Sequence, residues 1–340
     1  MTDRRLPAEW EPQSAVLLTW PHAHGDWGHH LDEAQQTFAA MARAIASRQR
    51  LVISCHDTES LAQVEALTRG LSSVERLLIP SNDIWVRDHG PITVLQSGQP
   101  RLLNFRFNGW GNKYPAKLDD QIPRALAPAA FPGTPLESVD LVLEGGSIES
   151  DGAGTLMTTR RCLLHPGRNP SLDELATERA LRDWLGVRKV LWLEHGELEG
   201  DDTDGHVDML ARFAPGNRIL YSACDDPDDV HYRPLQAMER ELRAFRNSEG
   251  APYELLPLPW PPARHDEDGQ RMPLSYANFL VINGAVLVPV YDVPTDQPAL
   301  ELIRHAFPGR AIVPIDALPL IRQHGSVHCA SMQIPAPATA

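Results

Sequence analysis

Apolar side chains recur every three to four positions in several stretches of the chain, a spacing that predicts helices with one buried face. One such helix lies between Leu31 and Arg48. A second is predicted to begin at Ser171, because Ser171 and Glu174 form a capping-box pattern, and to end at Gly186. Its predicted buried face comprises Leu172, Leu175, Leu181, Trp184 and Leu185. Two later helices carry the apolar positions Leu235, Met238, Leu242 and Phe245, and Leu300, Ile303 and Phe307.

Short runs rich in β-branched and apolar residues separate these helices and predict strands. The runs cover residues 15–19, 51–54, 92–95, 190–193, 218–221, 279–282, 285–289 and 311–314. The dipeptide Asn283-Gly284 stands between two of them, and both residue types tolerate positive φ. The sequence therefore predicts a tight β-hairpin at this point.

The order strand, strand, helix, strand recurs along the chain. The helices predicted near Ser171, Arg233 and Gln297 begin 62 and 64 residues apart. About five units of that size fit into 340 residues, and such repetition favours one closed array over unrelated domains. We therefore expect a single domain over residues 1–340, although the N-terminal half shows the period less clearly. The Pro- and Ala-rich residues after Ile334 are expected to be flexible.

The charge of the chain narrows the classes of partner. It has 31 Lys and Arg residues against 45 Asp and Glu residues, a formal net charge of −14. This balance argues against nucleic acid and anionic membranes, and it suits either a small cationic ligand or solubility alone. No run approaches the roughly 18 apolar residues of a membrane span, and no apolar signal core follows the N-terminus, so we expect a cytoplasmic protein. The sequence leaves a homo-oligomer open.

The cysteines are few, widely spaced and free of any C-x-x-C pairing that would indicate zinc or redox chemistry. In the reducing cytoplasm they are expected to be free thiols, and any of them could be a nucleophile. They are Cys55, Cys162, Cys224 and Cys329.

Four polar, glycine-containing stretches stand at the ends of predicted strands: residues 85–91, 144–147, 202–208 and 325–329. In chain order they carry Asp88, Glu144, the pair His206 and Asp208, and Cys329. Together these side chains offer a nucleophile, a proton carrier and anionic groups that can hold a cation. The set predicts a substrate with a cationic electrophilic carbon.

Each of these residues also has a purely structural interpretation. Asp88 follows an arginine and could form a surface ion pair, and Glu144 precedes two glycines and could belong to a turn. His206 and Asp208 lie on one face of a predicted strand, which would also suit a metal ion. Cys329 alone could be a small buried apolar residue.

The ordered motifs resemble those of agmatine deiminases and bacterial peptidyl-arginine deiminases, which modify guanidino groups. The similarity extends over nearly the whole chain and includes residues 7–12, 108–114, 167–170 and 275–279. It implies an α/β fold, a five-bladed propeller (pentein) of ββαβ units around a central active site. It also implies a hydrolase without a cofactor or metal that converts agmatine to N-carbamoylputrescine and ammonia, a step of putrescine and polyamine biosynthesis.

The resemblance also assigns roles to the five candidate side chains. Asp88 and Asp208 are expected to hold the guanidinium nitrogens by charge-assisted hydrogen bonds. Cys329 is expected to attack the central carbon as a thiolate, and His206 to act as general acid and then general base. Glu144 is expected to hydrogen-bond His206 and to stabilise its protonated form.

Other positions bear on which guanidino compound is bound. Asp202 occupies the place where an acidic residue of the family pairs with the distal amine of agmatine. Trp85 could stack on the guanidinium or line the alkyl channel, or it could be structural. The chain departs from the usual family pattern at His324 and Ser326, where agmatine deiminases have Gly and Asn, and at Asp204, where they have Asn. Asp204 adds an acid near the site, whereas His324 and Ser326 change the wall beside the nucleophile.

Three alternatives to an agmatine deiminase stay open. Arginine or peptidyl-arginine could be the substrate of the same chemistry, although no pair of arginines is evidently placed for the carboxylate of free arginine. A manganese ureohydrolase would need further Asp and His clusters. A non-catalytic guanidine-binding protein would leave the cysteine without a role. The histidines at positions 22, 24, 29 and 30 could form a metal tract, but a solvated or substrate-gating loop is favoured.

Overall fold

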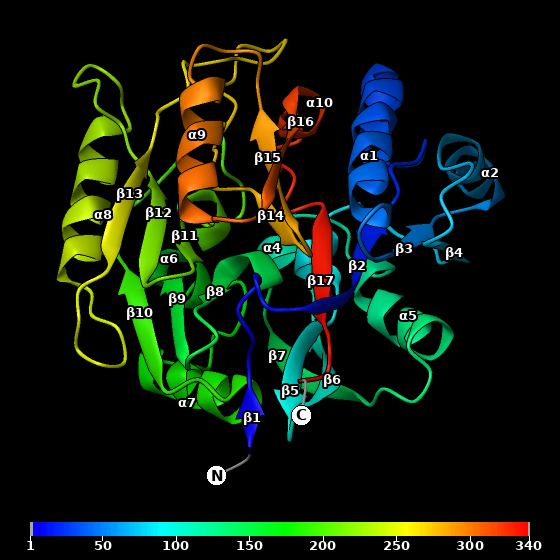
Figure 1. Cartoon of the computed structure of the whole chain (residues 1–340), viewed down its shortest axis with the longest axis horizontal. Helices are drawn as coiled ribbons and strands as arrows, with labels where there is room; N and C mark the ends of the chain where they lie inside the picture. The colour runs from blue at the N-terminus through cyan, green and yellow to red at the C-terminus, as the bar shows by residue number, and fades with distance from the viewer. Residues whose placement is uncertain (1–2, 339–340) are drawn as a thin grey trace.

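Five small sheets follow one another around the molecule in the computed structural model, which describes residues 3–338 (Figure 1). In each sheet an antiparallel strand pair is extended by a strand that runs parallel to its neighbour, and a helix makes the crossover between the parallel strands. The fold predicted by the resemblance, a five-bladed α/β propeller of ββαβ units, is confirmed.

Four of the units are continuous in sequence. The first comprises β5 (Ile92–Gln96), β6 (Gln99–Arg106), α5 (Ile122–Ala130) and β7 (Leu136–Val142). The second comprises β8 (Ile148–Ser150), β9 (Thr155–Thr159), α7 (Glu174–Leu185) and β10 (Lys189–Leu193). The third comprises β11 (Ala211–Ala214), β12 (Arg218–Ser222), α8 (Tyr232–Ala244) and β13 (Glu254–Leu258). The fourth comprises β14 (Leu280–Ile282), β15 (Ala285–Val290), α9 (Asp296–Ala306) and β16 (Ala311–Asp316).

The fifth unit is assembled from both ends of the chain. Strand β17 (Ser331–Pro335) pairs antiparallel with β2 (Gln13–Thr19), and α1 (Leu31–Ala46) then leads to β3 (Arg50–Cys55), which runs parallel to β2. Helix α2 (Thr58–Leu67) and strand β4 (Val74–Leu78) extend this sheet. The period is less clear in the N-terminal half because the first strand of this unit lies at the other end of the sequence.

Short elements connect the sheets and supply the centre of the molecule. They are β1 (Arg4–Arg5), α3 (Val86–His89), α4 (Gly109–Asn112), α6 (Arg160–Leu163), α10 (Leu318–Ile321) and the 3-10 turns η1 (Gly28–His30), η2 (Asp119–Gln121), η3 (Gly145–Ser147) and η4 (Val207–Met209). Turn η3 packs against both α3 and η4. Three of the four polar stretches therefore meet in space, although they lie far apart in the sequence.

The predicted helices are confirmed, with one error at the start of α7. Asp173, rather than Ser171, caps this helix and accepts a hydrogen bond from the amide of Ala176. The buried face is also narrower than predicted, since Leu175 is 69% exposed. The helix ends as expected at Gly186, whose φ of 70° lies in the left-handed region.

The predicted hairpin at Asn283-Gly284 is confirmed by the antiparallel pairing of β14 and β15, and Gly284 has a φ of 72°. The segment after Ile334 was expected to be flexible, but its described part is bound to the body of the protein. The amides of Ala336 and Ala338 donate hydrogen bonds of 2.8 Å to backbone carbonyls. Within residues 3–338, no helix is long and apolar enough to cross a membrane.

The close approach of the α7 C-terminus to β1 generates a prediction about Gly186. A Cβ at Gly186 would lie 1.8 Å from the carbonyl oxygen of Arg4, whereas a Cβ at Gly133, which has a similar positive φ, would contact nothing within 4 Å. Gly133→Ala is therefore expected to cost only the left-handed backbone penalty of about 1 kcal/mol. Gly186→Ala should cost clearly more, as measured by urea unfolding, and equal losses in the two variants would contradict the close packing of β1 on this helix end.

Candidate active site

A cavity of about 230 Å³ opens at the centre of the propeller, where the polar stretches meet. Aromatic rings of Trp85, Trp110 and Tyr114 form part of its wall. Its carboxylates come from Asp26, Asp83, Asp88, Asp202 and Asp208. A cavity with this lining favours a small ligand that is cationic and partly apolar.

Asp88 on α3 is held in place by groups from two other segments. Its Oδ2 accepts a hydrogen bond from Nε1 of Trp110 at 3.0 Å, and its Oδ1 accepts one from the amide of Gly146 at 3.0 Å. The same Oδ1 lies 3.6 Å from Nδ1 of His206. Burial raises the pKa of Asp88 to about 6, so its negative charge is costly in the empty cavity.

The thiol of Cys329 also lines the cavity and lies beside Asp208. Its Sγ is 3.6 Å from Oδ2 of Asp208 and accepts a hydrogen bond from the side-chain amide of Asn278 at 3.1 Å. The amide oxygen of Asn278 also accepts hydrogen bonds from the backbone amides of His328 and Cys329. Burial and the charges of Asp208 and Asp88 raise the pKa of Cys329 well above its usual value. These effects favour the protonated thiol over the thiolate.

His206 stands at the start of η4 between these groups. Burial alone would lower its pKa, but the charge of Asp88, helped by that of Glu144, outweighs this effect and raises the pKa well above its usual value. Among the described residues, neither ring nitrogen has a hydrogen-bond partner. The imidazolium is therefore available to donate a proton to a bound molecule.

Gly146 leaves the space into which the reactive side chains converge. A Cβ at this position would lie 2.7 Å from Nδ1 of His206, 2.8 Å from Oδ1 of Asp88 and 3.1 Å from Oδ2 of Asp208. No side chain fits there without displacing these groups. Gly146 is therefore needed for close packing as well as for the backbone geometry of a turn.

Known proteins are similar to this chain over nearly its whole length. The profile of the Porphyromonas-type peptidyl-arginine deiminase family matches residues 5–335. The chain belongs to this family. An agmatine deiminase of Pseudomonas aeruginosa (strain UCBPP-PA14) is 35% identical over 361 residues, which cover 99% of this chain and 96% of that protein.

Solved structures of family members superpose on the whole chain. A C. jejuni agmatine deiminase with a cysteine-to-serine change and bound substrate has a TM-score of 0.92 at 33% identity, covering 99% of this chain and 97% of its own. A Porphyromonas gingivalis protein, provisionally described as an arginine deiminase, has a TM-score of 0.92 at 46% identity, covering 98% of each chain.

One contact expected from the family resemblance differs in the structure. The carboxylate of Glu144 accepts hydrogen bonds of 2.9 Å from Nε of Arg168 and, among the described residues, forms none with His206. Donor atoms of Glu144, Cys162 and His206 nevertheless lie within 4.8 Å of one another. Glu144 therefore acts on His206 through its charge rather than through a hydrogen bond. Arg168 belongs to the matching motif at 167–170, but nothing in the sequence pattern pairs it with Glu144.

The additional acid at Asp204 is neutralised by cations and is not part of the cavity lining. Its carboxylate pairs with Nη1 of Arg168 at 2.7 Å and with Nζ of Lys113 at 2.8 Å. Burial alone would raise the pKa of Asp204, but these hydrogen bonds outweigh it and lower the pKa. Asp204 has a φ of 69°, a conformation that asparagine, the usual family residue, also tolerates.

The substitutions before Cys329 keep the backbone path that a glycine would take. His324 has a φ of 67°, and its Nδ1 lies 2.7 Å from the carbonyl oxygen of Gly200. Ser326 is buried. The imidazole of His324 contributes to the cavity wall, so this departure changes the shape of the wall.

Asp202 and Trp85, predicted to bind substrate, both line the cavity. Oδ2 of Asp202 accepts a hydrogen bond of 2.8 Å from the hydroxyl of Tyr114. Burial, together with this hydrogen bond, raises the pKa of Tyr114 to about 12. The ring of Trp85 packs on Gly325, where a Cβ would lie 2.3 Å from the ring. Its position makes Trp85 a rigid part of the wall.

A buried network behind Asp208 was not predicted. The ring nitrogens of His328 lie 2.8 Å from Oδ2 of Asp208 and 2.7 Å from Oε2 of Glu9. Arg212 pairs with the same oxygen of Glu9 at 2.9 Å. Burial alone would raise the pKa of Asp208, but its hydrogen bond with His328 outweighs this and lowers the pKa. Asp208 therefore stays ionised beside Cys329.

This network generates a prediction about Glu9. Burial alone would raise its pKa, but the charges of His328 and Arg212 outweigh burial and hold the pKa well below its usual range. Glu9→Gln should destabilise the protein by about 3 kcal/mol at pH 7, because buried cations lose their counter-charge. The stabilisation that Glu9 supplies is present above its unfolded pKa of about 4.3, so the difference from wild type should shrink as the pH falls below that value.

Urea unfolding of both proteins between pH 7 and pH 3 measures this difference. Glu11→Gln is the matched control, since Glu11 is 27% exposed in its ion pair with Arg5 and should cost less than about 1 kcal/mol. A loss for Glu9→Gln no larger than that of the control would contradict the proposed network.

Proposed function

We propose that the chain is a hydrolase of C–N bonds in linear amidines that converts agmatine to N-carbamoylputrescine and ammonia. The observation that carries the proposal is the convergence of Cys329, His206, Asp88 and Asp208 around Gly146 in an acidic cavity. Agmatine deimination by relatives of the same length and fold supports it. The catalytic unit is one domain over residues 1–340, and its product would enter putrescine synthesis.

Binding fixes the charge and the plane of the guanidinium. Asp88 and Asp208 converge with His206 on the space beside Gly146, and their carboxylates can form charge-assisted hydrogen bonds to the guanidinium nitrogens. Oδ1 of Asp208 is buried and has no hydrogen-bond partner among the described residues. A bound guanidinium would satisfy this oxygen and neutralise the unfavourable charge of Asp88.

The same cation prepares the nucleophile. Burial and the charges of Asp208 and Asp88 raise the pKa of Cys329; the positive charge of the substrate offsets those two charges, so the thiol can lose its proton to solvent. The thiolate forms a C–S bond to the central carbon and gives a tetrahedral adduct. Protonated His206 donates its proton to one nitrogen, the C–N bond breaks, and ammonia leaves. The enzyme then holds a cationic amidino-thioether.

In the hydrolysis step, His206 acts as a base and Cys329 becomes the leaving group. Neutral His206 accepts a proton from water as the oxygen bonds to the amidino carbon. The C–S bond then breaks, and the adduct loses its hydroxyl proton to solvent. The ureido product, the thiolate and the imidazolium result. Glu144, fixed by Arg168, favours the imidazolium by its charge.

Arginine is the second candidate, because identity to the P. gingivalis protein exceeds identity to the agmatine deiminases. Free arginine would need a cation for its α-carboxylate. Arg322 lines the cavity, but its guanidinium already pairs with Glu33 and with Nδ1 of His30. Agmatine has no α-carboxylate, and its distal amine can pair with the carboxylate of Asp202 in the cavity wall, which favours agmatine as the substrate. A cytoplasmic location and a homo-oligomer stay predictions from the sequence.

Replacing the thiol of Cys329 tests whether the chain is an enzyme or a non-catalytic guanidine-binding protein. Cys329→Ser should lower the rate of agmatine deimination by at least about a thousandfold, because the hydroxyl is a far weaker nucleophile. Agmatine binding, measured by calorimetry, should persist, and Cys224→Ala should keep both binding and turnover. Turnover retained in Cys329→Ser would exclude the covalent mechanism, and binding without turnover in the wild type would identify a binding protein.

A substrate panel tests the specificity. We expect kcat/KM to be highest for agmatine, compared with arginine and an arginine-containing peptide, with ureido product as the readout. Asp202→Asn should lower kcat/KM for agmatine about tenfold, since one charge-assisted hydrogen bond is lost, and should change the arginine value little. Asp183→Asn, at an exposed position of α7, is the control. A higher kcat/KM for arginine or the peptide would reverse the assignment.

A further inference from the structure

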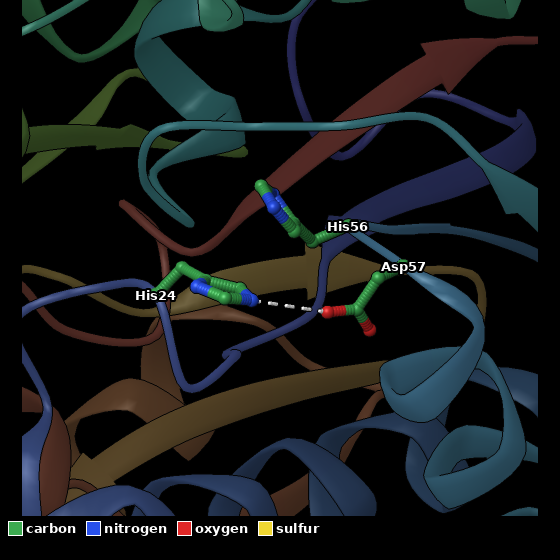
Figure 2. A group of neighbouring side chains, drawn as sticks. All are labelled: His24, His56 and Asp57. Atoms are coloured by element: carbon green, nitrogen blue, oxygen red, sulfur yellow. Dashed lines mark ion pairs between the residues drawn. The ribbon is translucent and has the colours of Figure 1, made fainter.

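Two segments that carry none of the proposed catalytic side chains bring together histidine and aspartate side chains. His24 lies between β2 and η1, and His56 and Asp57 directly follow β3 (Figure 2). One donor atom from each residue lies within 4.8 Å of the other two. Nε2 of His24 is 3.5 Å from Oδ2 of Asp57, and Figure 2 shows the two groups pointing toward each other.

Hydrogen bonds orient Asp57 so that one oxygen stays available. Its Oδ1 accepts hydrogen bonds from the amide and the hydroxyl of Ser60 at 2.8 and 2.7 Å, in the cap of α2. Oδ2 is the atom that faces His24.

The ring of His56 is fixed in a similar way. Its Nδ1 lies 2.8 Å from the carbonyl oxygen of Ser81 and 3.2 Å from the amide nitrogen of the same residue. These contacts with Ser81 occupy Nδ1 and leave Nε2 as the ring nitrogen that can bind a cation. His22 stacks on this ring with centroids 4.1 Å apart.

We propose that His24, His56 and Asp57 form a site for one borderline divalent metal ion such as Zn²⁺, completed by water. Imidazole and carboxylate groups are the donors that such ions accept in tetrahedral geometry. Two ligands of a tetrahedral zinc ion lie about 3.3 Å apart, close to the His24–Asp57 separation of 3.5 Å.

A bound ion would join the segment before η1 to the turn after β3. The same segment carries Asp26, which lines the central cavity, and Trp27, whose ring centroid lies 6.4 Å from that of Trp85. The ion would therefore hold one side of the cavity rim in place. This role is independent of the proposed catalytic chemistry, which uses no metal.

A second group, formed by His29, His30 and Glu267, has a similar composition but is not suited to a metal ion. His29 and His30 both approach Oε1 of Glu267 at 3.4 Å. Nδ1 of His30 lies 2.8 Å from the guanidinium of Arg322, which can only donate, so the ring proton of His30 is on the nitrogen that faces Glu267. The adjacent guanidinium also repels a metal cation. This group is an ion-pair network and serves as an internal control.

Calorimetry with Zn²⁺ tests the proposal in a Cys329→Ser background, which excludes the catalytic thiol as a ligand. We expect one ion per chain, with affinity at least tenfold weaker in His24→Ala and His56→Ala. Asp57→Asn should weaken binding while it preserves the helix cap. His29→Ala, in the same segment, should bind zinc as the parent protein does.

Thermal unfolding gives a second readout that does not involve activity. Zn²⁺ should raise the unfolding midpoint of the parent and of His29→Ala, because it binds the native state, and should leave those of His24→Ala and His56→Ala unchanged. An absence of zinc binding in the parent would overturn the proposal. Equal affinity in the parent, His24→Ala and His56→Ala would also overturn it, because the ion would then bind elsewhere.

Discussion

The central cavity is organised around two buried carboxylates that face a thiol before any substrate is present. Burial, together with the charges of Asp208 and Asp88, raises the pKa of Cys329, and burial raises that of Asp88 itself. A flat cation relieves both effects at once, because it pairs with the carboxylates and favours the thiolate. In the proposed reaction, the charge of the substrate is thus coupled to activation of Cys329.

The buried carboxylates are neutralised by arginine side chains from other parts of the fold. Arg168 compensates Glu144 and Asp204, and Arg212 compensates Glu9 and Glu149. These partners come from different units of the propeller, and Glu9 and His328 are separated by 319 residues in sequence. Closure of the ring by β17 and β2 therefore also completes the charge balance of the site. Stability and catalytic geometry depend on the same contacts.

The local features of this fold could be read from the sequence because each depends on neighbouring residues. Helical spacing predicted α1, α8 and α9, and Asn283-Gly284 predicted the hairpin between β14 and β15. The predicted start of α7 at Ser171 was wrong, because the side chain of Asp173 caps the helix instead. Neither the pairing of Arg168 with Glu144 nor the link from Glu9 to His328 leaves a periodic signal, since each joins residues that only the tertiary fold brings together.

The meeting of the candidate catalytic residues was likewise beyond any local pattern, and only the ordered family motifs connected Asp88, His206 and Cys329. The same motifs mark where the chain departs from its relatives. His324 and Asp204 both occupy left-handed conformations that glycine and asparagine adopt more readily. Hydrogen bonds to Gly200 and Arg168 hold them there. The backbone around the nucleophile can therefore stay constant while side chains alter the cavity wall.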